Sequence, residues 1–230
     1  MAGIMTRTAK LIGAGAALTA VSWAGYAAVT WSRYGTGIEH GREDPLLDRF
    51  LPEYEVRERH EIRVASPAAT TWAAALDLDL QRSGMVRAIF SGRDLLMGAK
   101  ASGRSRPRRF LDEVLALGWR VLAEEPGREI VLGAVTQPWQ ADVVFRGLDP
   151  DEFAAFDEPG YAKLVWNFRV EPAGVDASVF QTETRVSTTD PASRERFRRY
   201  WSVFSPGILL IRHESLRLIR REAERRIARP

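Results

Sequence analysis

Charged and apolar residues alternate along residues 54–64, and this repeat of two is typical of a strand with one buried face. One face of the predicted strand carries only glutamate and arginine. The other face is apolar except for Glu58 and His60. The pattern therefore predicts a half-buried strand that directs one carboxylate and one imidazole toward the core.

Apolar residues at helical spacing follow over residues 68–78, 85–97 and 110–117, which predicts three helices. Ser66 and Pro67 suit the start of the first helix as an N-cap and a first helical residue. Between the second and third helices, residues 100–109 contain glycine, serine, proline and five basic residues. This composition predicts an exposed loop.

Short apolar and β-branched runs occupy much of the chain between residues 119 and 187. Pro126-Gly127 suits a turn between the first two runs, and residues 172–176 suit a turn between the last two. The sheet is therefore expected to be mostly antiparallel. We expect its strands over residues 119–123, 129–135, 143–146, 163–170 and 179–187.

A long last helix is predicted from Asp190-Pro191 toward Arg229, because aromatic and aliphatic residues recur there at helical spacing. Pro206-Gly207 is expected to kink or briefly interrupt it.

The first part of the chain is expected to associate with a membrane. About 22 residues without a charge, Leu11–Ser32, are long enough to cross a bilayer as a helix. Arg7 and Lys10 precede this stretch, which favours a cytoplasmic N-terminus and an extracytoplasmic domain. The alternative is a signal peptide that is cleaved near Gly25-Tyr26-Ala27. We therefore expect a single-pass anchor over residues 1–32, a polar tether over residues 33–50 and one folded domain over residues 51–230.

Composition excludes several classes of site. The chain has 230 residues with a formal net charge of only +3, which does not indicate a nucleic-acid-binding protein. It has no cysteine, so disulfides, thiolate metal sites and cysteine nucleophiles are excluded. Its three histidines, His40, His60 and His213, are too scattered to predict a metal site. No metal and no cofactor is expected.

Two stretches resemble bacterial members of the SRPBCC superfamily, which includes START-like lipid-binding domains and polyketide cyclase/dehydrase-like proteins. They are EYEVRERHEIRVASPAATTWAAA near the start and FQTETRVSTTDPASRERFRRYWSVFSPGILLIR near the end. The resemblance implies an α+β helix-grip fold, in which a curved antiparallel sheet wraps around the last helix and leaves a cavity between them. No catalytic motif of the superfamily can be placed on individual residues of this chain.

Glu58 and His60 are the candidate catalytic residues, because a carboxylate beside an imidazole could act as a general acid and base on a bound carbonyl compound. The alternative is a polar pair that serves only the structure.

Aromatic residues on the predicted sheet and last helix could enclose an apolar ligand, although such residues more often form a core. Thr182 and Thr184 share one strand face, and Gln181, Glu183 and Arg185 share the other, so one set could line the inside while the other forms a surface ion pair. The pattern leaves open which set points inward. The candidate ligand-binding residues are Trp166, Phe168, Phe180, Tyr200, Trp201 and Phe204.

The leading hypothesis is a membrane-anchored protein that binds a lipid or another apolar small molecule between its sheet and last helix. The alternatives are a cyclase, dehydratase or hydrolase that uses Glu58 and His60, and a non-enzymatic interaction or scaffolding module. The basic residues of the 100–109 loop and of residues 220–229 could contact anionic headgroups.

Overall fold

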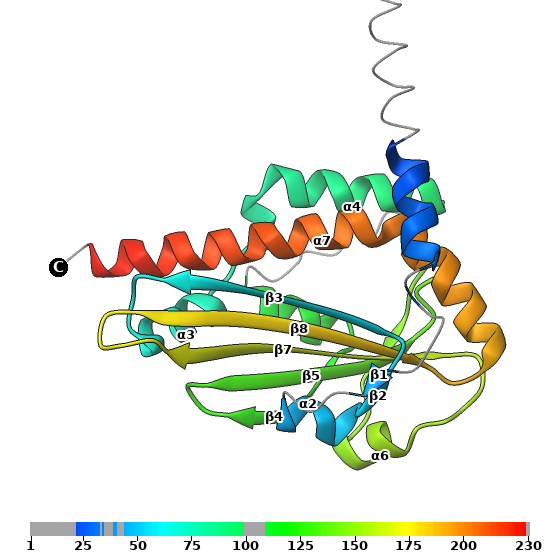
Figure 1. Cartoon of the computed structure of the whole chain (residues 1–230), viewed down its shortest axis with the longest axis horizontal. Coiled ribbons are helices and arrows are strands. Elements are labelled where there is room, and N and C mark those ends of the chain that lie inside the picture. Colours follow the sequence, from blue (N-terminus) through cyan, green and yellow to red (C-terminus); the bar gives the residue numbers. More distant parts are fainter. Residues whose placement is uncertain (1–21, 33, 35–38, 41–43, 99–108, 229–230) are drawn as a thin grey trace, which may run out of the picture.

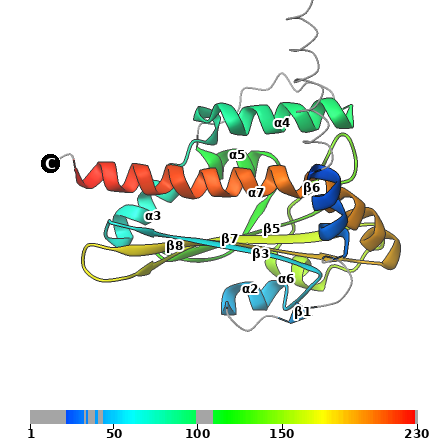
Figure 2. The ribbon, with the colours of Figure 1, turned by 45° about the horizontal axis from the view of Figure 1, so that its top comes forward.

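A six-stranded antiparallel sheet with helices on both faces forms the body of the protein (Figure 1, Figure 2). The computed structural model describes residues 22–32, 34, 39–40, 44–98 and 109–228. The sheet curves beneath a long last helix, α7 (Pro191–Ile227). This α+β arrangement fits the helix grip that the resemblance implies.

The other elements follow in an order close to the predicted one. The strands are β1 (Glu39–His40), β2 (Glu53–Tyr54), β3 (Val56–Val64), β4 (Arg120–Glu125), β5 (Glu129–Thr136), β6 (Phe145–Arg146), β7 (Ala162–Pro172) and β8 (Ser178–Thr188). The remaining helices are α2 (Pro45–Phe50), α3 (Ala68–Leu76), the 3-10 helix η1 (Leu80–Arg82), α4 (Gly84–Met97), α5 (Phe110–Ala116) and α6 (Pro150–Ala155). A further helix covers residues 22–32.

Turn and capping residues in the sequence mark where several of these elements begin and end. Gly127 has φ +77° and the amide of Arg128 donates to the carbonyl of Glu125, so Pro126-Gly127 forms the predicted turn between β4 and β5. Asp190 caps α7 by accepting a hydrogen bond from the amide of Ser193. Helix α6 lies outside the predictions, although the capping box of Asp149 and Glu152 marks its start.

The strands lie in the order β3-β8-β7-β5-β4, and β6 pairs with β5. Because side chains alternate along a strand, the sheet has one face toward α3, α5 and α7 and an opposite face toward α2 and α6 (Figure 2). We call these the α7 face and the α2 face. The largest apolar cluster lies on the α7 face and includes Trp166, Phe168, Phe180, Leu216 and Ile219.

The α2 face is covered by a helix that the sequence predicts as tether. Leu47 and Phe50 of α2 are buried against Val131 and Val165 of the sheet, together with Phe153 of α6. Residues 44–50 therefore belong to the folded body rather than to a free linker. The reason is that α2 is too short to show a helical period, so its apolar residues gave no clear signal.

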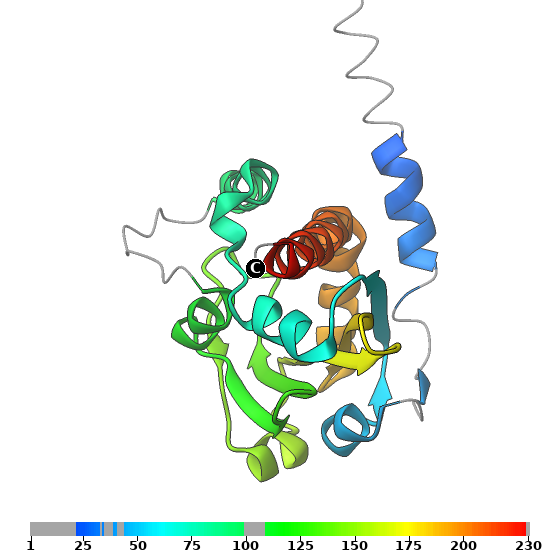
Figure 3. The ribbon, with the colours of Figure 1, turned by 90° about the vertical axis from the view of Figure 1, so that its left-hand side faces the viewer.

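Helix α7 runs over the sheet and bends near Pro206, as the sequence predicts (Figure 1). Seen along α7, helix α4 and the helix over residues 22–32 lie on opposite sides of it (Figure 3).

The predicted membrane segment is only partly within the described residues, because Leu11 to residue 21 lie outside them. Among the helices that the structure describes, none combines the length and the hydropathy that a bilayer crossing requires.

Candidate functional site

A buried polar cluster lies on the α7 face, where β3 and β8 meet the second half of α7. Strand β3 contributes Glu58 and His60, which lie opposite Thr184 and Thr182 of β8 in the antiparallel register. Arg212 of α7 reaches both threonines, and its Nη1 donates to Oγ1 of Thr182 over 3.3 Å. The two candidate catalytic residues therefore point inward, and the threonines face the helix with them.

Glu58 is the centre of this cluster. Its Oε1 accepts a hydrogen bond from the hydroxyl of Tyr34 over 2.5 Å, and its Oε2 lies 3.6 Å from Nε2 of His60. Burial opposes the charged form of Glu58. The neighbouring His60 and Tyr34, with the charge of Arg212, outweigh that effect and lower the pKa of Glu58 below its ordinary value. Glu58 is therefore a carboxylate at neutral pH.

Arg212 brings a positive charge into the same cluster. Its Nε is buried, and burial lowers the pKa of Arg212 to about 10 although the charge of Glu58 opposes this. Nε of Arg212 and Nε2 of His60 are buried without a hydrogen-bond partner. Nε2 of His60 faces the Glu58 carboxylate at 3.6 Å, whereas Nε of Arg212 is a buried donor that makes no hydrogen bond to the described residues.

His213 lies beside His60, with the two ring centroids 4.9 Å apart. The Nδ1 of His213 donates to the carbonyl of Leu209 over 2.8 Å, so this imidazole is oriented by its own helix. Two histidines that sequence analysis considered scattered therefore meet, although the described residues contain no group of three side chains suited to hold a metal ion.

An aromatic cluster continues from the polar one toward β5. Trp166 contacts Phe168 at a ring-centroid distance of 4.9 Å, and Phe168 contacts Phe180 at 5.2 Å. Phe110 and Trp119 cover Trp166 from the other side, at 5.7 Å and 6.2 Å. Three of the six candidate ligand-binding residues are thus brought together on the α7 face.

The other three candidates lie in a different cluster. Trp201 is buried with Phe197 against β3, β7 and β8, and Tyr200 packs at its margin. Phe204 contacts Tyr200 at 5.1 Å. These residues precede the bend at Pro206, whereas the part of α7 that covers Trp166 and Phe168 follows it. The six candidates, expected on the two sides of one site, therefore lie in two separate clusters.

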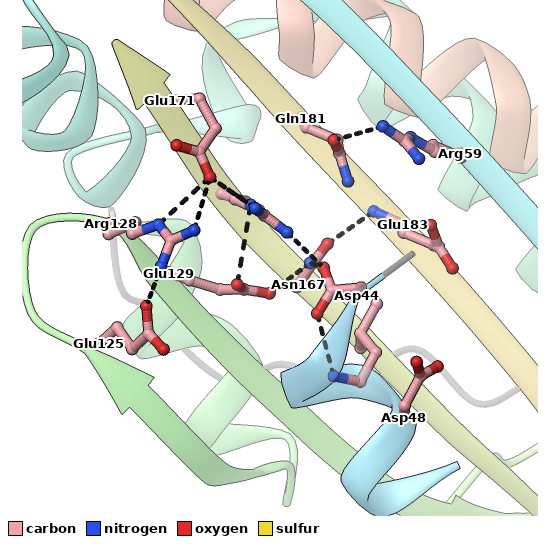
Figure 4. A network of polar contacts seen from close by, with 12 residues as sticks. Asp44, Asp48, Arg59, Glu125, Arg128, Glu129, Asn167, Glu171, Gln181 and Glu183 are labelled. Atoms are coloured by element: carbon pink, nitrogen blue, oxygen red, sulfur yellow. Dashed lines mark hydrogen bonds and ion pairs between the residues drawn. The ribbon is translucent and has the colours of Figure 1, made fainter. Parts of the chain in front are cut away.

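A second polar network lies on the α2 face (Figure 4). There Arg185 and Glu183 form an ion pair over 2.7 Å, and both side chains are fully buried. The predicted surface ion pair is therefore an interior one, because α2 covers this face and Asp48 of α2 binds Arg185 over 2.5 Å.

Sequence analysis missed Arg212 and Tyr34. Arg212 has a signal, because it lies four residues after Ile208 and four before Leu216, within the buried stripe of α7. Tyr34 has none, because it lies outside any periodic segment.

Two surface hollows are lined by residues other than Glu58, Trp166 and Phe168. One of about 320 Å³ lies between α2 and α6 and includes Lys163, and the other of about 380 Å³ lies between α3 and the end of α7 and includes Arg226.

No protein-family model matches the chain, and no curated protein sequence matches it. Solved structures with similar folds include the Zhui aromatase/cyclase from Streptomyces sp. R1128, with 14% identity over 75% of this chain and 95% of that chain and a TM-score of 0.27. Norcoclaurine synthase from Thalictrum flavum has 12% identity over 76% of this chain and 88% of that chain, with a TM-score of 0.34. A conserved protein from Geobacillus kaustophilus has 13% identity over 74% of this chain and 96% of that chain, also with a TM-score of 0.34. At these values none brings an activity to this chain, and its fold rests on its own strand order and last helix.

Proposed function

We propose that this chain binds an amphipathic, lipid-like small molecule between its sheet and α7, and that its N-terminal segment holds it at a membrane. The apolar body of the ligand would lie along Trp166 and Phe168, and its polar end would meet Glu58 and Arg212.

One observation carries the proposal, a single row of paired residues across the α7 face. Glu58 lies opposite Thr184, Thr184 lies opposite Trp166, and Trp166 lies opposite Leu132. The row passes from a carboxylate through a hydroxyl to an indole and a leucine within four neighbouring strands. A ligand with one polar end and one apolar end matches this order, because each part then meets groups of its own polarity.

General acid–base catalysis by Glu58 and His60 is the second candidate, and the 3.6 Å separation of their side chains favours it. The lowered pKa of Glu58 weighs against it, because a strongly ionised carboxylate is a weak base at neutral pH.

Tryptophan fluorescence of the full-length protein, titrated with fatty acids, fatty alcohols, phospholipids and sterols, tests the binding function. We expect a saturable change with at least one class, and binding about tenfold weaker in Trp166→Leu because leucine offers the ligand less apolar surface than the indole does. Phe156→Leu is the matched control, since Phe156 packs on Tyr161 at 5.6 Å on the α2 face, away from Trp166. A cooperatively folded protein with no response to any class would favour the scaffolding module instead.

A further inference from the structure

A side chain from outside the sheet and α7 occupies the polar end of the proposed site. Tyr34 follows the helix over residues 22–32, and its hydroxyl donates to Oε1 of Glu58 over 2.5 Å. Its ring meets the edge of Trp201, with centroids 6.2 Å apart and an interplanar angle of 82°. Tyr34 therefore supplies the hydrogen-bond donor on Glu58 that the polar end of the ligand would supply, while its ring packs on Trp201 of α7.

The helix before Tyr34 is held against the first half of α7 by polar contacts. Nε of Arg198 donates to the carbonyl of Trp31 over 2.7 Å, and the guanidinium lies 4.2 Å from the centre of the Trp31 ring. Ser205 donates to the hydroxyl of Tyr26 over 3.4 Å. We call this helix together with Tyr34 the strap.

The strap is lightly held. In its helix Thr30 is buried, but Val29 is 63% exposed and Trp23 is 43% exposed. Segments with few buried apolar side chains open locally at a small cost in free energy. Displacement of the strap from α7 therefore requires much less than unfolding of the domain.

We infer that the strap is an autoinhibitory contact, which a ligand with a hydroxyl at its polar end displaces by replacing Tyr34 on Glu58. The inference rests on the proposed function. A donor is required because Glu58 is an ionised acceptor, and its pKa is lowered by the groups around it. A neutral hydroxyl fits better than an ammonium group, because Arg212 already supplies the opposite charge beside Glu58.

Ligand binding and release of the strap from α7 are thermodynamically linked, so each affects the other. If the ligand and Tyr34 compete for Glu58, a ligand that binds loosens the helix over residues 22–32, and a force that draws this helix from α7 favours ligand binding. The state of the N-terminal segment and the occupancy of the site are thereby coupled.

Equilibrium dialysis of the full-length protein with 2-naphthol and with 2-methoxynaphthalene tests the inference. The two probes share an apolar body, and only the first donates a hydrogen bond. We expect Tyr34→Ala to tighten 2-naphthol binding by about tenfold, the value of one hydrogen bond to a charged group, and 2-methoxynaphthalene binding by much less.

Arg198→Ala is the second variant, because it releases Trp31 and leaves Tyr34 and Glu58 intact. It should also tighten 2-naphthol binding, by a smaller factor. Tyr161→Ala is the matched control, since Tyr161 packs on Phe156 at 5.6 Å, away from Glu58. It should leave the affinity unchanged.

The outcomes separate the two proposals. Equal 2-naphthol affinity in the wild type, Tyr34→Ala and Arg198→Ala overturns the strap and leaves the binding function standing. An equal gain for both probes overturns the hydroxyl requirement. Absence of binding by either probe in all of these folded variants overturns the proposed function itself.

Discussion

Asp44 and Glu129 share one hydrogen-bond donor, the side-chain nitrogen Nδ2 of Asn167, at 2.9 Å and 2.6 Å (Figure 4). Both carboxyl groups are buried, with exposed fractions of 1% and 2%. Asp44 also caps α2 by accepting from the amide of Leu47. Burial raises the pKa of Glu129 to about 7, with a further contribution from Asp44, although Asn167 and Arg169 oppose the shift. A proton on Glu129 therefore relieves the repulsion between the two buried carboxyl groups beside α2.

The first prediction concerns the pH dependence of stability. The folded state binds the Glu129 proton more tightly than the unfolded state, whose pKa is near 4.5. The free energy of unfolding should therefore fall as the pH rises from about 4.5 to about 7, by on the order of 3 kcal/mol. Denaturant unfolding at several pH values measures this. In Glu129→Gln the fall should disappear, and in Glu125→Gln, an exposed control, it should persist. Parallel profiles for the wild type and Glu129→Gln would show that another group is responsible.

The second prediction concerns Asp48 and the buried Arg185. Asp48→Asn removes a charge that lies 2.5 Å from a guanidinium with no exposed surface. Glu183 then balances the buried Arg185 cation without the charge of Asp48. The free energy of unfolding should therefore fall by about 2 to 3 kcal/mol. Glu195→Gln is the control. It breaks an exposed pair with Arg199 one helical turn away and should change stability by less than about 0.5 kcal/mol.

The third prediction concerns Arg212. Arg212→Leu leaves Glu58 buried without its neighbouring cation, so the free energy of unfolding at neutral pH should fall by about 3 to 5 kcal/mol. Glu58→Gln in the same chain should restore part of this loss, because the amide oxygen still accepts from Tyr34 and carries no charge. A double-mutant cycle measured by denaturant unfolding gives the coupling. Additive losses would mean that the two charges do not interact.

The fourth prediction concerns the start of the folded body. A chain that begins at Leu51 lacks α2 and exposes the sheet surface under Leu47 and Phe50, two side chains whose burial is worth about 1.5 to 3 kcal/mol each. We expect it to melt at a lower temperature than a chain that begins at Asp44. Equal melting temperatures would mean that residues 44–50 do not stabilise the folded domain and act as a tether.

The fifth prediction concerns the membrane. The full-length protein should sediment with membranes and resist extraction by high salt, because about 22 uncharged residues are not displaced by screening. Recovery of a soluble form that begins near Ala28 would indicate a cleaved signal peptide instead.

Local geometry allowed much of this structure to be predicted from the sequence. The period of two in β3 placed Glu58 and His60 on the face that α7 covers, because successive side chains of any strand point to opposite sides. Asp190-Pro191 marked the start of α7, and Pro206 marked its bend, because capping and the missing amide of proline act within a few residues.

Only the tertiary structure decided what these residues meet. Gln181, Glu183 and Arg185 have the same alternation as an exposed strand face, yet all three are buried, and Asp48 of α2 binds Arg185 from more than a hundred residues away. Glu58 has two partners, Tyr34 and Arg212, and they come from opposite ends of the chain. Periodicity determines to which side of its own element a side chain points. Which residue it then meets depends on how elements distant in sequence pack together, and a local sequence pattern holds no information about that packing.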